Sequence, residues 1–158
     1  MDELRGILEP DAADILVLNK HLFRLEPRFA FGFRDKGFWG RKISVTDSEP
    51  GSVLISRQSR HIPDLSDAQV SFPGCDLTTE GFHAYFAEPM IVRGEPLGVL
   101  EVFMRRPFFP DEDWLSFFNA MATEAAVALD FARQYEDLQN TKQRMSSSFH
   151  STLEAWSR

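Results

Sequence analysis

The chain has 158 residues, which is enough for one ordinary domain with a packed core and too few for two full-sized domains. Its net charge of −7 argues against a nucleic-acid-binding protein, because phosphate contacts require clustered lysine and arginine. The apolar runs fall well short of the roughly 20 residues that a transmembrane helix needs, so we expect no membrane partner.

Cysteine, histidine and the few basic pairs add little chemistry. Cys75 is the single cysteine, so the chain can form no internal disulfide, which fits a reducing compartment. The four histidines are scattered and give no metal-ligand spacing. The N-terminus MDELRGILEPD is acidic where a signal peptide would be basic. We therefore expect a cytoplasmic protein without a metal site, and the pairs Arg41-Lys42 and Arg105-Arg106 on its solvated surface.

The first predicted elements form a strand hairpin. ADILVLN (13–19) is a short apolar run that ends in a polar turn, and LFRLEPRFAFGF (22–33) roughly alternates before it reaches glycines. Residues 34–52 are rich in Gly, Lys, Arg, Asp and Ser, a composition that predicts a loop.

A short helix and an edge strand are expected next. VLISRQS (53–59) predicts the helix, and RHIPDL (60–65) predicts an edge strand, where Pro63 is tolerated. Residues 66–81 combine proline, two glycines and many small polar groups in a long irregular segment. Such segments in compact domains are usually functional or mobile, so we expect a lid here.

A second hairpin and a helix complete the domain. HAYFAEPMIV (83–92) and EPLGVLEVFM (95–104) predict the two strands. Pro110 and the acidic residues that follow it suit the first turn of a helix, in which apolar residues and alanines then recur with helical period. Strands followed by a closing helix predict an α+β fold with a central antiparallel sheet and a long C-terminal helix.

The end of the helix carries a heptad pattern of apolar residues, interrupted by Lys142 and Thr152. The helix could fold back onto its own sheet, but the domain should be complete by about residue 135. We therefore expect residues 1–135 to form the domain and 136–158 to form a helical stalk that pairs in parallel with a second copy. We call its apolar stripe the seam: Phe131, Tyr135, Leu138, Met145, Phe149 and Trp156.

The second hairpin and its helix resemble a GAF domain. The features that carry the resemblance are the proline in the first strand, G-x-x-x-G-V-L across the turn, F-x-x-x-D, and an alanine-rich helix that ends A-R-x-Y-x-x-L. HIPDL (61–65) also falls where GAF domains often carry a strand ending in aspartate. The resemblance covers about residues 11–140. It implies a PAS-related fold, with helices on one face of the sheet and a small-molecule pocket on the other.

The tail SSSFHSTLEAWSR is similar to the segment that joins GAF domains to HD-GYP domains. HD-GYP domains are metal-dependent phosphohydrolases, many of which hydrolyse cyclic-di-GMP, so the resemblance implies an output domain of this class. The chain has neither a His-Asp pair nor a Gly-Tyr-Pro triplet, so it cannot carry that catalysis itself. The chain also ends without a helix-stop signal, and only DELRGIL precedes the first strand. We therefore expect a piece of a longer signalling protein.

The known ligand classes of GAF domains fit poorly. Cyclic-nucleotide-binding members carry Asn-Lys where this chain has Arg105-Arg106. Bilin-binding members use a cysteine usually followed by histidine, whereas Cys75 is followed by Asp76. Free-methionine-sulfoxide reductases of this fold exchange disulfides among several cysteines, and a single cysteine cannot complete that cycle. The ligand and any cofactor remain undetermined by sequence.

Glu101 is the residue that most clearly suggests a pocket, because it interrupts an apolar strand. We expect a three-residue loop, Val92 to Gly94, because a two-residue turn would require a positive φ at Arg93. That register sets Tyr85 opposite Glu101 and His83 opposite Phe103, on the face away from the helix. The expected ligand-pocket residues are therefore Phe82, His83, Tyr85, Glu101 and Phe103.

Three interpretations of this pocket remain open. The preferred one is a small-molecule sensor that regulates an output domain. A collapsed pocket would leave only a dimerising spacer, and an enzyme could use Glu101 and His83 as acid and base. For Glu101 itself a further alternative is open, in which it pairs with Arg34, Arg41 or Arg57 in a purely structural role. Glu88 falls on the helix side of the sheet, and its role is not explained by the sequence.

Overall fold

A computed structural model of the chain describes residues 6–157. Six strands form one antiparallel sheet in the order β3-β2-β1-β6-β5-β4. The strands are β1 (Ala12–Asn19), β2 (Arg24–Phe31), β3 (Ile43–Ser44), β4 (Arg60–Ile62), β5 (Ala84–Val92) and β6 (Glu95–Met104). The helices are the 3-10 helix η1 (Lys36–Gly40), α2 (Glu49–Ser56), α3 (Leu77–Glu80) and α4 (Glu112–Trp156). The expected α+β class, with its central antiparallel sheet and long C-terminal helix, is confirmed.

The chain divides into two units, one up to Ala126 and one from Val127 onwards. The first unit holds the sheet and the start of α4, and the second is the rest of α4. No helix within residues 6–157 is long and apolar enough to cross a bilayer. The predicted change from domain to stalk near residue 135 stays a prediction.

The predicted hairpins are present, but two local expectations were wrong. The segment 34–52 is more than a loop, since it holds η1, β3 and the start of α2. Helix α2 begins at Glu49, ahead of the predicted 53–59, because Ser48 caps it: the Ser48 Oγ accepts a hydrogen bond from the Gly51 amide at 3.0 Å. Pro50 in the first turn is also typical of a helix start.

The turn between β5 and β6 differs from the predicted three-residue loop. Val92 pairs with Glu95, so Arg93 and Gly94 alone make the turn, with φ of 52° and 75°. Two successive positive φ angles give the turn a twist that matches its strands, which offsets the cost at Arg93. A register shift between Met90 and Ile91 then follows.

The resulting register differs from the predicted one by two residues. Tyr85 lies opposite Phe103, and Ala87 lies opposite Glu101, whereas the sequence predicted Tyr85 opposite Glu101. A slip of one residue would have exchanged the two faces of the strand, but a slip of two preserves them. Glu101, Phe103 and Tyr85 therefore share one face, as expected.

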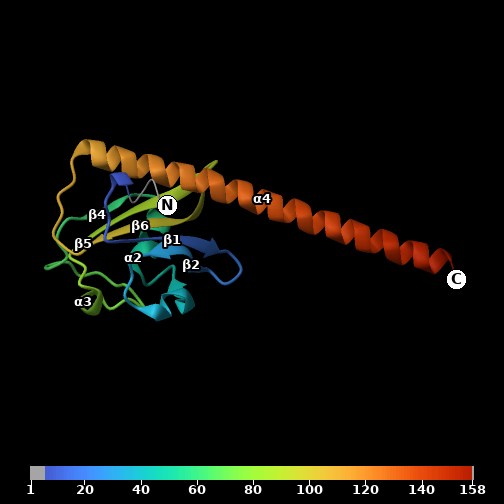
Figure 1. Cartoon of the computed structure of the whole chain (residues 1–158), viewed down its shortest axis with the longest axis horizontal. Coiled ribbons are helices and arrows are strands. Elements are labelled where there is room, and N and C mark those ends of the chain that lie inside the picture. Colours follow the sequence, from blue (N-terminus) through green and yellow to red (C-terminus); the bar gives the residue numbers. More distant parts are fainter. Residues whose placement is uncertain (1–5, 158) are drawn as a thin grey trace. The chain divides into compact units, whose positions relative to one another are not determined.

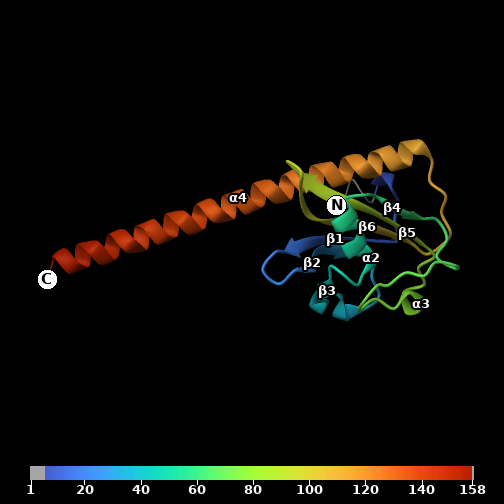
Figure 2. The same cartoon turned by 180° about the vertical axis from the view of Figure 1, so that it is seen from behind.

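Each face of the sheet is covered by different elements (Figure 1). The start of α4 covers the face that carries Phe86 and Glu88: the ring of Trp114 lies 5.0 Å from that of Phe86, and Phe118 is fully buried. The acidic start of α4 is confirmed, since Asp111 Oδ1 accepts the Trp114 amide at 2.8 Å. The reverse view shows α2 and α3 on the other side of the sheet (Figure 2).

The face opposite α4 holds most of the core. Helix α2 contributes Val53 and Leu54, and the irregular segment 66–81 contributes Phe72. These side chains pack against Leu16 on β1 and Val99 on β6. The face that was expected to carry a pocket is therefore closed by an apolar layer, and Glu101 lies beneath that layer.

Candidate functional site

Four polar side chains meet inside this apolar layer, and we call them the interior polar cluster: Asp14, Arg41, Tyr85 and Glu101. Asp14 on β1 lies directly opposite Glu101 on β6 in the strand register. Both carboxyls are buried, with 0% and 1% of each residue exposed. Tyr85, fully buried on β5, donates its hydroxyl hydrogen to Glu101 Oε2. Three neighbouring strands thus bring two acids and a phenol together.

The cluster holds a proton on Asp14. Burial, the charge of Glu101 and a hydrogen bond with Glu101 raise the pKa of Asp14 well above its usual range. Burial also raises the pKa of Glu101, while hydrogen bonds from Tyr85 and Asp14 oppose that rise. Two adjacent buried carboxyls cannot both be ionised at low cost. The pair therefore favours one shared proton, and the stronger rise at Asp14 favours Asp14 as its holder, with a hydrogen bond to Glu101.

The pKa of Tyr85 is raised as well, first by burial and then by the neighbouring Glu101 charge. Its hydroxyl therefore stays protonated and remains a donor. The Glu101 carboxylate receives two O–H groups, one from Tyr85 and one from Asp14. Such bonds stabilise a buried negative charge but do not remove it, so a compensating positive charge is needed nearby.

Arg41 supplies this positive charge. Its charge lowers the pKa of both Asp14 and Glu101, although burial dominates each shift. The residue follows η1 and is only 9% exposed, so the expectation that it lies on the solvated surface was wrong. The guanidinium stacks over the Phe38 ring at 4.9 Å, and Nη2 donates to the Pro73 carbonyl at 3.2 Å.

Several polar atoms of the cluster lack direct partners. Within residues 6–157, Arg41 Nε and Nη1 are buried without a hydrogen-bond partner. Neither Asp14 oxygen accepts a hydrogen bond from an N–H or O–H group of the described chain. One Asp14 oxygen carries the hydrogen that is donated in the hydrogen bond to Glu101. The other Asp14 oxygen is therefore an unused acceptor. Unused donors and an unused acceptor are thus buried together, at a cost of about 1–3 kcal/mol for each group.

Residues 66–76, which we call the cover segment, close the cluster from outside. The Phe72 ring stands edge-on to Tyr85 at 4.7 Å and lies 5.9 Å from the Phe103 ring. The Ser71 carbonyl accepts the amide hydrogen of Glu49, the first residue of α2, at 2.9 Å. The segment expected to form a lid is therefore packed over the cluster, and the Phe72 ring fills the space next to Tyr85 and Phe103.

Phe82 and His83 occupy a separate place. They line a hollow of about 390 Å³ between the end of β4 and α3, together with Leu65, Ser66, Leu77, Thr78 and Gly81. His83 is exposed, whereas Phe82 is buried and stacks on Phe103 at 4.6 Å. Phe82 thus lies between this hollow and the aromatic rings around the cluster.

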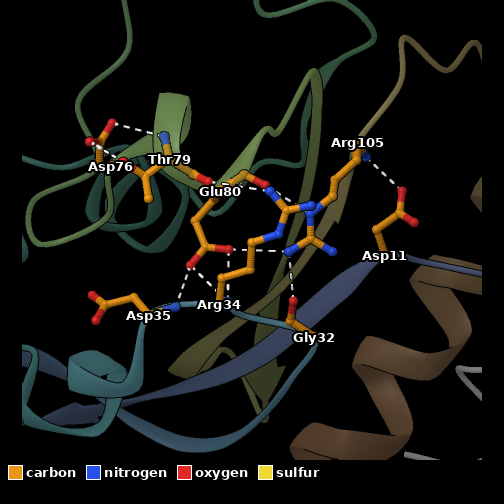
Figure 3. Close-up of polar contacts among 8 residues, drawn as sticks. All are labelled: Asp11, Gly32, Arg34, Asp35, Asp76, Thr79, Glu80 and Arg105. Carbon is orange, nitrogen blue, oxygen red and sulfur yellow. Dashed lines mark hydrogen bonds and ion pairs between the residues drawn. The ribbon is translucent and has the colours of Figure 1, made fainter.

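A second buried acid anchors the chain next to the cover segment (Figure 3). Glu80, at the end of α3, is 1% exposed and accepts hydrogen bonds from the amides of Arg34 and Asp35 at 2.9 Å each. Arg105 pairs with Glu80 at 3.1 Å, and it also donates to the carbonyls of Gly32 and Glu80. Arg105 is thus no freely solvated surface residue, contrary to expectation.

Glu88 now has a structural explanation. It lies on the α4 side of the sheet, as expected, and is 2% exposed. Its carboxylate accepts hydrogen bonds from Ser59 at 2.6 Å and Asn119 at 3.2 Å, and His61 Nε2 lies 3.4 Å away. Glu88 therefore joins the edge of the sheet to the start of α4.

The expected site residues fall into two groups. Tyr85, Glu101 and Phe103 lie together in the interior, while Phe82 and His83 line the hollow. Sequence reasoning missed Asp14, although a lone aspartate in the apolar run ADILVLN carries the same signal as Glu101. Arg41 gave no comparable signal. Within the described residues, no group of three or more His, Cys, Asp or Glu side chains could hold a metal ion.

A six-stranded antiparallel sheet, with the start of α4 on one face and a buried polar cluster on the other, defines an α+β sheet-and-helix domain. The sequence matches the GAF domain family over residues 4–129, so the chain belongs to that family. GAF domains are typical of sensory signal-transduction proteins, are generally regulatory rather than catalytic, and commonly bind small molecules and dimerise. No curated protein matches the chain in sequence.

Solved structures of GAF domains share the fold. One is the GAF domain of a phosphoenolpyruvate-protein phosphotransferase from Coxiella burnetii, with 19% identity, coverage of 84% of this chain and 79% of that chain, and a TM-score of 0.75. Another comes from a two-component sensor histidine kinase of Bacillus halodurans, with 20% identity, 85% and 90% coverage, and a TM-score of 0.73. A GAF domain/HD domain protein from Geobacter sulfurreducens has 16% identity, 84% and 88% coverage, and a TM-score of 0.71.

Proposed function

We propose that this chain is the small-molecule sensor of a cytoplasmic signalling protein, and that its ligand binds at the interior polar cluster beneath the cover segment. The observation that carries this proposal is the burial of Asp14, Glu101 and Arg41 in an otherwise apolar layer. Buried ionic groups are often less stabilising than well-packed apolar residues of similar size. Local departures from good packing are expected at functional sites, so the cluster supports a binding role.

Ligand binding would displace Phe72 and draw the cover segment away from Tyr85 and Phe103. Phe82 and His83, at the neighbouring hollow, would then line the route into the site. The enzyme alternative has less support, because Glu101 is buried whereas His83 is exposed and lines the separate hollow. The spacer interpretation has one observation in its favour, which is that Phe72 already fills the space against Tyr85.

Native mass spectrometry of the purified protein, with small-molecule extraction, tests sensor against spacer. We expect a co-purifying compound that raises the melting temperature of the stripped protein when it is added back. Glu101→Gln should abolish that stabilisation, and Glu88→Gln should retain it, because Glu88 is equally buried but lies on the other face. Absence of any bound compound, or an unchanged response in Glu101→Gln, would contradict the proposed site.

We further propose that the chain forms a homodimer through the seam. All six seam residues are between 57% and 82% exposed in the second unit. An exposed apolar stripe of this kind marks an interaction surface, and its heptad spacing favours a parallel helix pair. Small shifts between the two helices would then couple the ligand site to an output domain, and the tail resemblance favours an HD-GYP phosphohydrolase.

Analytical ultracentrifugation at micromolar concentration tests the dimer. The unmodified chain should sediment as a dimer, and Leu138→Glu with Met145→Glu should give a folded monomer. Asn140→Glu with Ser147→Glu adds the same charge outside the seam and should leave the dimer intact. A monomeric unmodified chain would refute the helix pairing without bearing on the ligand site.

A further inference from the structure

The interior polar cluster also indicates the charge of its ligand. Asp14 and Glu101 face each other across neighbouring strands and are both buried, so they cannot both be ionised at low cost. The pair therefore contributes one negative charge, and Arg41 contributes one positive charge. The cluster is therefore already neutral. A ligand with a net charge at this point would leave one buried charge without a counterion, which is strongly unfavourable.

The unpartnered atoms indicate the hydrogen bonds that the ligand would make. Arg41 presents two buried donors, Nε and Nη1, without partners among residues 6–157. Asp14 presents an acceptor oxygen that receives no hydrogen bond from the described protein groups. A group that fits both must accept a hydrogen bond at one atom and donate one at another. A carboxylate can only accept, and an amidinium can only donate.

The surrounding rings indicate the shape of the ligand. Phe72 presents its edge to Tyr85 and lies near Phe103, so a flat ring already fits between these side chains. Phe38 stacks on Arg41 and extends the aromatic surface on the side of the guanidinium. A planar ligand could replace the Phe72 ring and keep comparable contacts when the cover segment moves.

We propose that the cluster binds a flat, uncharged ligand that presents both a hydrogen-bond acceptor and a hydrogen-bond donor, as in an aromatic amide, a lactam or the edge of a nucleobase. The acceptor would bond to Arg41 and the donor to Asp14. This inference rests on the proposed sensor function, which it narrows to one class of ligand chemistry.

Three probes of one shape separate the charge types: benzamide, benzoate and benzamidine. Amide nuclear magnetic resonance titrations of the full chain should show benzamide shifting the signals of residues 14, 41 and 101. We expect it to bind at least about tenfold more tightly than either charged probe, because each of those leaves a buried charge unpaired.

Substitutions in the cluster should then switch the preference among the probes. Asp14→Asn combined with Glu101→Gln removes both acids and leaves Arg41 uncompensated, so benzoate should become the best probe. Arg41→Met leaves Glu101 uncompensated, so benzamidine should become the best probe. Glu88→Gln, the matched control, should keep the preference for benzamide. Arg41→Gln replaces Arg41→Met if the methionine variant does not give the dispersed spectrum of a folded protein.

The outcomes separate this inference from the sensor function. If a charged probe binds the unmodified protein as well as benzamide does, or if neither variant switches, the assignment of a neutral ligand is wrong. If no probe moves the cluster signals while a co-purifying compound stabilises the protein and Glu101→Gln abolishes that stabilisation, the inference fails and the proposed sensor site stands. If no probe binds and no compound co-purifies, both fail, and the cluster is a structural feature only.

Discussion

Asp14→Asn tests the protonation of the cluster through the pH dependence of stability. The pKa of Asp14 in the folded protein is raised above the unfolded value of about 3.9. The folded chain therefore holds a proton that the unfolded chain releases above about pH 4. The contribution of Asp14 to stability should therefore fall as the pH rises from about 4 towards its folded-state pKa. Asparagine keeps the shape and a donor toward Glu101 but does not titrate.

The magnitude follows from proton linkage. One proton bound only by the folded state changes the unfolding free energy by about 1.4 kcal/mol for each pH unit. The unfolding free energy of Asp14→Asn, minus that of the unmodified protein, should therefore rise by up to about 1.4 kcal/mol per pH unit above about pH 4. The difference should level off once the pH passes the folded-state pKa.

Urea unfolding at about pH 3, 4, 5, 6 and 7 measures this difference. Asp64→Asn is a control of opposite sign: hydrogen bonds from Ser66 lower the pKa of the exposed Asp64 carboxyl. These hydrogen bonds stabilise the folded protein above about pH 4 and are lost at lower pH, when Asp64 becomes protonated. The unfolding free energy of Asp64→Asn, minus that of the unmodified protein, should therefore fall as the pH rises towards about 4. A difference for Asp14→Asn that is flat or falls between pH 4 and 7 would show that Asp14 is ionised in the folded protein.

Three further predictions concern the anchor, the thiol and the sheet. Arg105→Met leaves the Glu80 carboxylate buried without its cation and should lower the unfolding free energy by about 3 kcal/mol in urea titrations, whereas Arg106→Met should change it little. Burial raises the pKa of the Cys75 thiol to about 11. Iodoacetamide should therefore label Cys75 in the folded protein about 100-fold more slowly than in the unfolded chain. Equal labelling rates would contradict the burial of this thiol. Gly98→Ala would place a Cβ 2.0 Å from the Leu16 carbonyl oxygen and should destabilise the fold by several kcal/mol in thermal unfolding, while Gly40→Ala, with nothing within 4 Å, should be nearly neutral.

The sequence by itself determined the two long hairpins, the C-terminal helix and the faces of the strands. Alternation along β6 places Glu101 on one side and Leu100 and Val102 on the other, whatever the exact pairing. Helix α4 was predictable from its acidic start and its apolar period, both of which are local. The irregular character of segment 66–81 was predictable, because its proline, glycines and small polar residues do not suit a strand or a long helix.

The tertiary structure decided which distant residues meet. Asp14 faces Glu101 only because β1 lies beside β6 in the sheet, and no local pattern encodes that neighbour. Arg41 and Arg105 looked like surface residues, but loop packing buried the first beside the carboxyls and joined the second to Glu80. Local sequence fixes the direction of a side chain relative to its own strand or helix, whereas strand order and loop packing bring together groups far apart in the chain. The interior polar cluster depends on both, so the sequence indicated its face and only the fold supplied its partners.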